Sequence, residues 1–318
     1  MIALVTGAAG FIGSTLVREL LKDDVVEQVI GVDSVTDYYD PQCKRRNLSE
    51  LPSSSRFRFI EADLNVLDLY ELLKNIDVVY HQAGQPGVRK SWGTSFADYI
   101  DNNIAATQKL LEAAKQSAKL SRFVYASSSS VYGNSEEYPT TEISVPRPYS
   151  PYGVTKLAAE HLVSLYAQNY GLPTVSLRYF TVYGPRQRPD MAMHRFIASA
   201  LNGRKIELYG DGTQVRDFTF VDDVVNANIL AGNSTAVSPG AVLNICGGST
   251  VTVNDVLDTI GSLAGVKLQI VRTAKVAGDV FKTAGTNVGA LREIGWAPCV
   301  SLEEGLDRHI RHLRASLI

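Results

Sequence analysis

The stretch TGAAGFIG, residues 6–13, decides how this chain folds. It follows a short apolar run at residues 2–5, and its glycines Gly7, Gly10 and Gly13 have the spacing G-x-x-G-x-x-G. Glycines permit a tight turn, let the main chain approach a pyrophosphate and let a helix pack closely on a strand. The amides and dipole at the start of that helix favour a phosphate there. The stretch therefore predicts a strand, a turn and a helix that together bind a dinucleotide.

Two carboxylates further along the chain support this prediction. Asp33 ends the second apolar run, about 20 residues after Gly13, where it can accept hydrogen bonds from the adenosine ribose and repel a 2'-phosphate. Asp63 follows the third run and can either meet the adenine amino group or cap the next helix. The basic residues 44–46 are interpreted as a solvated face. We therefore expect NAD as cofactor, bound by Gly7, Gly10, Phe11, Ile12, Gly13, Asp33, Asp63, Tyr152 and Lys156.

Short apolar runs alternate with segments of helical period through the first half of the chain. This alternation predicts an α/β fold with a doubly wound parallel sheet of Rossmann type. The pattern weakens after Tyr179, where prolines and glycines interrupt shorter elements, so we expect a smaller, mostly C-terminal lobe; the run at 242–246 is a candidate to return to the sheet. The expected strands are residues 2–5, 29–33, 56–61, 77–81, 122–126 and 174–178. The expected NAD-binding domain is 1–179 plus about 218–247, and the expected lobe is 180–217 and 248–318.

Composition excludes several classes of function. The net charge is -2 and the pI is near 6.2, which offers no basic field for nucleic acid. No apolar stretch approaches the roughly 20 residues of a membrane span, and the first apolar run follows Met1 directly, which leaves no room for a signal peptide. Cys43, Cys246 and Cys299 lack the spacing of metal ligands or of a disulfide framework. We expect a cytoplasmic protein with no metal, no nucleic-acid partner and no membrane.

A serine run and a Tyr-x-x-x-Lys pair are the candidate catalytic groups. Ser128 lies in the run at 127–130, directly after the fifth expected strand, and Tyr152 and Lys156 follow a proline-rich turn. Residues four apart share a helix face, and a cation beside a phenol lowers its pKa, so Tyr152 can act as a base while Ser128 holds the reacting oxygen. Such a pair in isolation is ordinary helix surface. At the carboxyl end of a nucleotide-binding sheet it predicts catalysis.

These motifs together resemble the extended short-chain dehydrogenase/reductase family, specifically its nucleotide-sugar epimerases and dehydratases. The resemblance implies that Tyr152 is the base, that Lys156 fixes the nicotinamide ribose and that Ser128 bonds the sugar 4-oxygen. It also implies that Arg216 grips the nucleotide diphosphate and that the protein is a homodimer. Matching segments cover nearly the whole chain: residues 6–13, Asp33, 127–133, Tyr152 with Lys156, 103–107, 178–185 and 210–218.

Members of this family follow C4 oxidation by three different chemistries. The keto-sugar is turned over and reduced again in an epimerase, loses water in a 4,6-dehydratase, or loses carbon dioxide in a glucuronate decarboxylase. Dehydratases resemble one another in an Asp-Glu pair after the catalytic Thr, and decarboxylases usually carry a Glu there. This chain has Ser129 and Ser130 instead, and Ser128 in place of the Thr. Without an acid/base pair for elimination, the resemblance favours a 4-epimerase.

Three features most resemble UDP-glucuronate 4-epimerases: residues 81–92, residues 186–191, and Thr181 in place of a common Asn. Hydroxyl groups near C6 can hold a carboxylate without strong polarisation. Arg89 can instead contact the cofactor or a phosphate, and Arg188 the UDP moiety. Residues 275–279 match the uridine-binding stretch only loosely, so thymidine or another base stays open. The expected substrate residues are Arg89, Ser128, Ser129, Ser130, Thr181, Arg188, Arg216 and Asp279.

Alternatives remain at the level of substrate and of class. Within the family these are a UDP-glucose or UDP-N-acetylglucosamine 4-epimerase, a UDP-glucuronate decarboxylase and a nucleotide-sugar 4,6-dehydratase. Outside it, a reductase of a free ketone would consume NADH, and an NAD(H)-binding sensor would have no use for Tyr152 and Lys156. One departure concerns the cofactor: residues 82–84 read Gln-Ala-Gly where Leu-Ala-Ala is usual, which changes the packing beside the nicotinamide.

Overall fold

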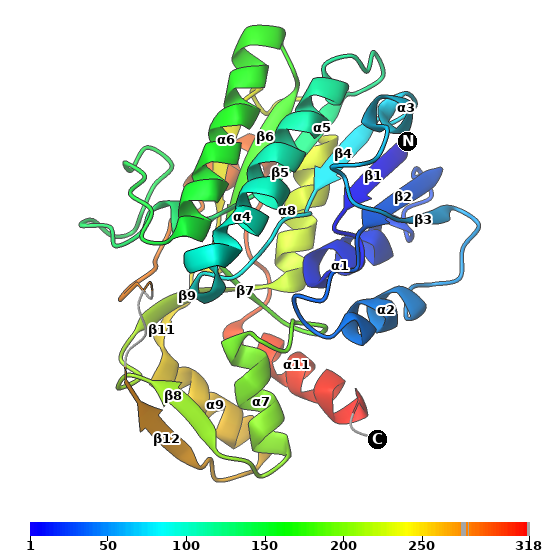
Figure 1. Cartoon of the computed structure of the whole chain (residues 1–318). Coiled ribbons are helices and arrows are strands. Elements are labelled where there is room, and N and C mark those ends of the chain that lie inside the picture. The colour runs from blue at the N-terminus through cyan, green and yellow to red at the C-terminus, as the bar shows by residue number, and fades with distance from the viewer. Residues whose placement is uncertain (275–277, 279, 317–318) are drawn as a thin grey trace.

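The computed structural model describes residues 1–274, 278 and 280–316. Seven strands of the described chain form one parallel sheet in the order β10-β6-β5-β4-β1-β2-β3 (Figure 1). The order reverses between β1 and β4, and the carboxyl ends of strands at such a switch point are where open α/β sheets bind ligands. This arrangement confirms the expected Rossmann-type sheet. Its strands are β1 (Ile2–Thr6), β2 (Gln28–Asp33), β3 (Phe57–Glu61), β4 (Val78–His81), β5 (Arg122–Ser128), β6 (Thr174–Tyr179) and β10 (Ala241–Ile245).

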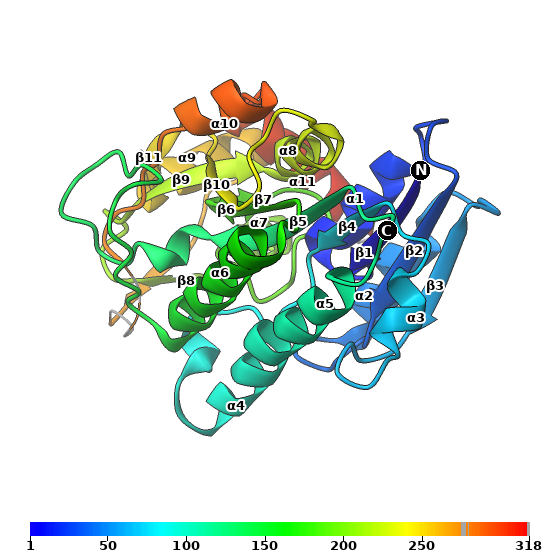
Figure 2. The same cartoon turned by 90° about the horizontal axis from the view of Figure 1, so that it is seen from above.

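Helices cover both faces of the sheet, because its strands are apolar on both sides. Along β1, Ala3 and Val5 pack in one core with α1 and α8, whereas Leu4 between them packs in a second core with α3, α5 and α6. Figure 2 shows these two layers from above. The helices of the sheet region are α1 (Phe11–Leu20), α2 (Pro41–Ser49), α3 (Leu69–Leu73), α4 (Phe96–Tyr99), α5 (Ala106–Ala114), α6 (Pro151–Tyr170) and α8 (Val221–Asn233).

Helix α6 has clear start and stop signals in the sequence. The Ser150 hydroxyl accepts a hydrogen bond from the Gly153 amide at 3.1 Å, and Pro151 occupies the first helical position. Gly171 ends the helix in the left-handed conformation, with φ of +68°. These signals place Tyr152 in the first turn of the helix, at the carboxyl end of β5.

The second part of the fold is a lobe below the sheet in Figure 1. The chain leaves the sheet after β6, returns through α8 and β10, and leaves again, and β10 pairs with β6 as the apolar run at 242–246 suggested. The exact domain borders remain a prediction. The lobe contains two small sheets, whose strand orders are β11-β9-β7 and β12-β8. The lobe elements are β7 (Thr181–Tyr183), α7 (Ala192–Leu201), β8 (Ile206–Tyr209), β9 (Val215–Phe220), β11 (Thr250–Thr252), α9 (Val253–Ala264), β12 (Ile270–Thr273), α10 (Val288–Ile294) and α11 (Leu302–Ser316).

In the portion of the chain covered by the structure, no helix has the length and apolarity that a membrane crossing requires.

Candidate active site

Two positions of the glycine-rich stretch between β1 and α1 have no room for a larger residue. Gly7 has φ of +70°, and an added Cβ there would lie 2.8 Å from the Ala83 amide nitrogen. An added Cβ on Gly13 would lie 2.0 Å from the Gly7 carbonyl oxygen. The loop and the start of α1 therefore pack main chain against main chain, and the amides at the start of such a helix suit a pyrophosphate. The predicted loop residues line this pocket: Gly7, Gly10, Phe11, Ile12 and Gly13.

The ribose end of the pocket centres on Asp33, which is buried at the end of β2. Its carboxylate accepts hydrogen bonds from the amides of Ala9 at 3.1 Å and Val35 at 2.8 Å. The Lys44 ammonium lies 3.4 Å from the same carboxylate and also donates to the Thr36 hydroxyl. The interpretation of residues 44–46 as a solvated face is therefore wrong for Lys44, which is buried against Asp33 and lines the pocket. No sequence spacing signals this pairing, because an irregular loop separates the two residues.

Asp63 lies at the rim of the same pocket. Its carboxylate accepts from the Asn65 amide at 2.8 Å and does not cap a helix. The cap of α3 is Asp68, whose carboxylate accepts from the Glu71 amide at 3.1 Å. The alternative of a helix cap was therefore wrong, and contact of Asp63 with adenine stays a prediction.

The three candidate catalytic residues meet at the carboxyl end of β5. Ser128 ends the strand and accepts a hydrogen bond from the Ser130 amide at 3.1 Å, and its side chain lowers the pKa of the neighbouring Tyr152 phenol. Lys156 lies one turn further along α6, where its ammonium donates to the Ala126 carbonyl at 2.8 Å. Tyr152 and Lys156 line the same pocket as the glycine loop. One pocket thus holds a dinucleotide cradle and a base of defined position.

The pKa of Tyr152 differs from the sequence-based expectation. Burial raises it above its usual value, because a phenolate loses solvation when it is buried; the Ser128 hydroxyl and the charge of Arg188 oppose this rise. A pKa lowered by Lys156 was the expectation, and it is wrong. Burial also lowers the pKa of Lys156, to about 8.

Two sets of side-chain hydrogen bonds hold residues that line this pocket or lie next to it. A π-helical turn, Ile100–Ala105, directs the Asn103 carboxamide to the Gln85 amide at 2.6 Å and to the Thr155 hydroxyl at 2.9 Å. The unusual Gln82 donates to the Asn228 side chain at 2.9 Å. The sequence matched Asn103 to the family but gave it no role. The hydrogen bonds of Asn103 join α6 to the loop after β4.

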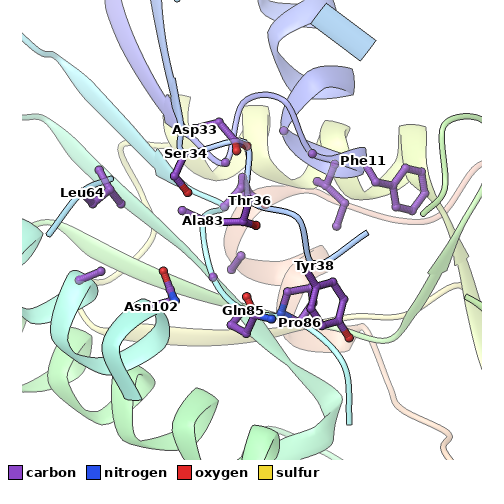
Figure 3. A pocket seen from close by; sticks show the side chains of 18 of the residues that line it. Phe11, Asp33, Ser34, Thr36, Tyr38, Leu64, Ala83, Gln85, Pro86 and Asn102 are labelled. Carbon is purple, nitrogen blue, oxygen red and sulfur yellow. The ribbon is translucent and has the colours of Figure 1, made fainter. Parts of the chain in front are cut away.

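Arg188 and Tyr38 close another side of the cofactor pocket. Arg188 makes two bonds of 3.0 Å to Asp190, and its guanidinium lies 5.7 Å from the centre of the Tyr38 ring. An added Cβ on Gly87 would lie 2.0 Å from the Tyr38 hydroxyl, so this side chain reaches the loop after β4. Figure 3 shows Tyr38 among the pocket side chains. Sequence reasoning missed Tyr38, and it expected Arg188 at the UDP moiety rather than in the pocket of Tyr152.

A second pocket lies in the lobe and gathers three of the predicted substrate residues: Arg89, Thr181 and Arg216. The Arg89 guanidinium lies 4.3 Å from the centre of the Tyr209 ring, and Tyr209 is a lining residue that sequence reasoning missed. Arg216 donates to the carbonyls of Val215 and Phe281. Asp279 lies outside the described residues.

Ser129 and Ser130 form, with Val131, a short 3-10 turn directly after Ser128. No carboxylate occupies these positions. Across the residues that the structure covers, no group of three or more His, Cys, Asp or Glu side chains is arranged to hold a metal ion.

A glycine cradle, a Ser–Tyr–Lys group and a second, arginine-lined pocket define an enzyme of dinucleotide-dependent chemistry on an anionic substrate. A sequence model of the NAD dependent epimerase/dehydratase family matches residues 3–246. The chain belongs to this family. The membership confirms the resemblance drawn from the sequence and the choice of NAD as cofactor.

Two relatives and one crystal structure, each named as an epimerase of a UDP-sugar, are similar to nearly the whole chain. The chain is 42% identical over 311 residues to an uncharacterized UDP-glucose epimerase of Bacillus subtilis (strain 168), covering 98% of this chain and 97% of that one. It is 36% identical over 311 residues to the UDP-glucuronate 4-epimerase of Thermodesulfobacterium geofontis (strain OPF15), covering 96% and 94%. The crystal structure of UDP-glucuronic acid 4-epimerase from Bacillus cereus, in complex with UDP-glucuronic acid and NAD, matches with a TM-score of 0.96 and 42% identity, over 99% of this chain and 100% of that chain.

Proposed function

We propose that this protein is a UDP-glucuronate 4-epimerase, an isomerase that interconverts UDP-glucuronate and UDP-galacturonate. The observation that carries the proposal is the turn after β5, where Ser129 and Ser130 follow Ser128 beside Tyr152. Hydroxyl groups can hold a sugar carboxylate by neutral hydrogen bonds and supply no acid/base pair for elimination. The names of the relatives from Thermodesulfobacterium geofontis and Bacillus cereus support the same substrate.

Each catalytic residue has one task in this proposal. NAD, when bound, accepts hydride from C4 of the sugar and returns it. Tyr152 takes the proton of the 4-hydroxyl and gives it back, while Ser128 holds the 4-oxygen. Lys156, fixed by the Ala126 carbonyl, holds the nicotinamide ribose. Because burial favours the neutral phenol, the base form of Tyr152 depends on the Ser128 hydrogen bond and on the charge of Arg188.

Of the expected substrate residues, Arg188 lines the cofactor pocket, and Arg89, Thr181 and Arg216 line the lobe pocket. Arg89 and Arg216 of the lobe pocket would hold the diphosphate, because a planar guanidinium matches phosphate oxygens. Thr181 would join Ser129 and Ser130 at the sugar carboxylate. Arg188 lines the pocket of Tyr152, so we assign it to the sugar end of the substrate rather than to the UDP.

The purified protein tests the proposal when it is incubated, without added NADH, with UDP-glucuronate and separately with UDP-glucose, and the sugar is followed by proton NMR. Conversion of UDP-glucuronate to its 4-epimer is the expected result. A pentose product would contradict the argument from Ser129 and Ser130. A reaction of UDP-glucose alone would favour the second candidate, a UDP-glucose 4-epimerase, which the name of the Bacillus subtilis relative suggests.

Two further properties belong to the proposal. A homodimer is supported by apolar side chains on α6 that remain exposed, Val154 at 49%, Leu165 at 49% and Tyr170 at 58%. A cytoplasmic location is supported by three free cysteines in the described chain, since thiols persist in a reducing compartment. Light scattering on a sizing column measures the first, and cell fractionation measures the second.

A further inference from the structure

A buried ion pair lies directly beneath the candidate active site. Arg178 of β6 donates to both carboxylate oxygens of Glu160 of α6, at 3.0 Å and 2.6 Å. Their side chains are only 5% and 3% exposed. The proposed chemistry of Tyr152, Ser128 and Lys156 uses neither residue.

The Glu160 carboxylate accepts a third hydrogen bond, from a second residue. The Ser127 hydroxyl donates to it at 2.5 Å, and Ser127 is bonded through the main chain to Ser128. On the far side of the ion pair, Arg178 donates to the Tyr132 hydroxyl at 2.7 Å, which in turn contacts the Asn244 carboxamide. Both oxygens of Glu160 are therefore fixed, and their direction sets the position of Ser127.

Side chains from one face of α6 thus contact three consecutive residues of β5. Positions 152, 156 and 160 of α6 are four residues apart, so their side chains share a face and rise by about 6 Å from one to the next. Each meets one residue at the end of the strand: Tyr152 the Ser128 side chain, Lys156 the Ala126 carbonyl, and Glu160 the Ser127 hydroxyl.

Stability alone gives a poor reason for this arrangement. A buried ion pair pays a desolvation cost, and well-packed apolar side chains often replace one without loss. Apolar residues would not fix the Ser127 hydroxyl, whereas a carboxylate held by two guanidinium bonds does. The function that remains for the pair is orientation.

We propose that Glu160 is a positioning residue for the reaction. It anchors Ser127, and through the main chain it fixes Ser128 against Tyr152, while Arg178 holds the Glu160 carboxylate in place. Glu160 lies one helical turn beyond Lys156 on the same face of α6, so three residues of that face, Tyr152, Lys156 and Glu160, act together. The inference rests on the proposed chemistry of Tyr152 and not on which UDP-sugar reacts.

Ser127→Ala is the cleaner test, because it removes the anchor and leaves the ion pair intact. Its matched control is Ser176→Ala, on the neighbouring strand β6, where an equally buried hydroxyl has no hydrogen-bond partner among the described residues. We expect kcat to fall about tenfold in Ser127→Ala with KM nearly unchanged, because misplaced reacting groups slow chemistry rather than binding. We also expect the acidic limb of the kcat pH profile to move to higher pH, because Ser128 would lower the Tyr152 pKa less.

Glu160→Gln supplies a second variant, since it keeps the shape and removes the charge. It should show the same fall in kcat and the same shift in pH profile, although unpaired Arg178 also lowers the thermal midpoint. Each variant is assayed with whichever UDP-sugar the wild type epimerises, so a wrong choice of substrate is seen in the wild type and does not affect the comparison. A Ser127→Ala enzyme with the kcat and pH profile of Ser176→Ala would overturn the proposal, as would a fall in kcat without any shift of the limb.

Discussion

Tyr152 shows how a single residue combines opposite physical demands. Burial protects the chemistry from water but raises the phenol pKa, and a base must lose its proton near neutral pH. Ser128 and Arg188 lower the pKa again. The reactivity of this phenol is therefore a property of its neighbours, and removing its hydroxyl should remove turnover while leaving the pocket in place.

Tyr152→Phe is the first residue-scale prediction. We expect epimerase turnover to fall by roughly 10² to 10⁴, the usual contribution of a general base. The protein should still purify with NAD, seen as the cofactor released on denaturation. Tyr170→Phe, at an exposed position on the same helix, is the matched control and should keep full activity. Turnover in Tyr152→Phe close to that of the wild type would rule out the mechanism.

The second residue-scale prediction concerns the preference for NAD over NADP. Asp33 repels a 2'-phosphate, while Lys44 at 3.4 Å would attract one. Asp33→Ser should therefore weaken NAD binding and strengthen NADP binding, measured as the two dissociation constants. The double variant Asp33→Ser/Lys44→Ala should lose the gain for NADP. If both variants bind NADP equally well, Lys44 does not contribute to this selection.

The sequence predicted the residues that regular elements carry. Tyr152 and Lys156 share a helix face by their spacing, and Gly13 faces Gly7 because a helix begins between them. Tyr38 and the role of Lys44 were missed, because Tyr38 lies in the irregular loop after β2 and Lys44 lies on α2, which that loop positions, and local spacing says nothing about where such a loop folds.

At the scale of elements, α6 depends on its first turn. The Ser150 cap satisfies an amide that no helical carbonyl can reach, and Tyr152 lies within that turn. A cap at this end therefore sets the position of the base as well as the stability of the helix.

Ser150→Ala should lower the free energy of unfolding by about 1 kcal/mol, measured by denaturant titration. It should also lower kcat, because a frayed first turn displaces Tyr152. The matched control is Asp68→Ala, which removes the cap of α3 at a distance from both pockets. The control should lose stability and keep kcat, and an equal fall of kcat in both variants would contradict the link between cap and base.

The strands of the sheet were predicted to within about two residues, because each is a short apolar run buried on both faces. The lobe was predicted only as a region. Its strands β7 and β11 are three residues long, too short to show a period, and β9 pairs with both of them across long separations in sequence. Pairing between strands so far apart in the chain cannot be read from the local sequence pattern.

At the scale of the whole molecule, buried histidines couple folding to pH. His309 is fully buried, and burial lowers its pKa to about 3. The unfolded chain binds a proton near pH 6.5 and the folded chain does not, so stability is retained above pH 6.5 and falls as the pH falls toward 3. Burial raises the pKa of Asp217 to about 6, which opposes this trend, because that contribution is lost as the pH rises through 6.

Comparison with a variant separates the contribution of His309 to the pH dependence of stability from that of groups such as Asp217. Relative to His309→Leu, the wild type should lose about 2 kcal/mol of unfolding free energy between pH 7 and pH 5, measured by denaturant titration at each pH. His161→Gln, at an exposed position on α6, is the control and should follow the wild type. Parallel curves for wild type and His309→Leu would show that His309 is not neutral when folded.

The return of the chain to the sheet through β10 limits how such a protein can be altered. Since the lobe is built from two segments on either side of that strand, no single contiguous gene fragment encodes it. To exchange the whole lobe between two relatives, recombination would need several crossovers, each at matching positions of the two genes. Specificity should therefore diverge by point substitution in the pocket linings rather than by transfer of a module, and chimaeras joined at one junction should misfold.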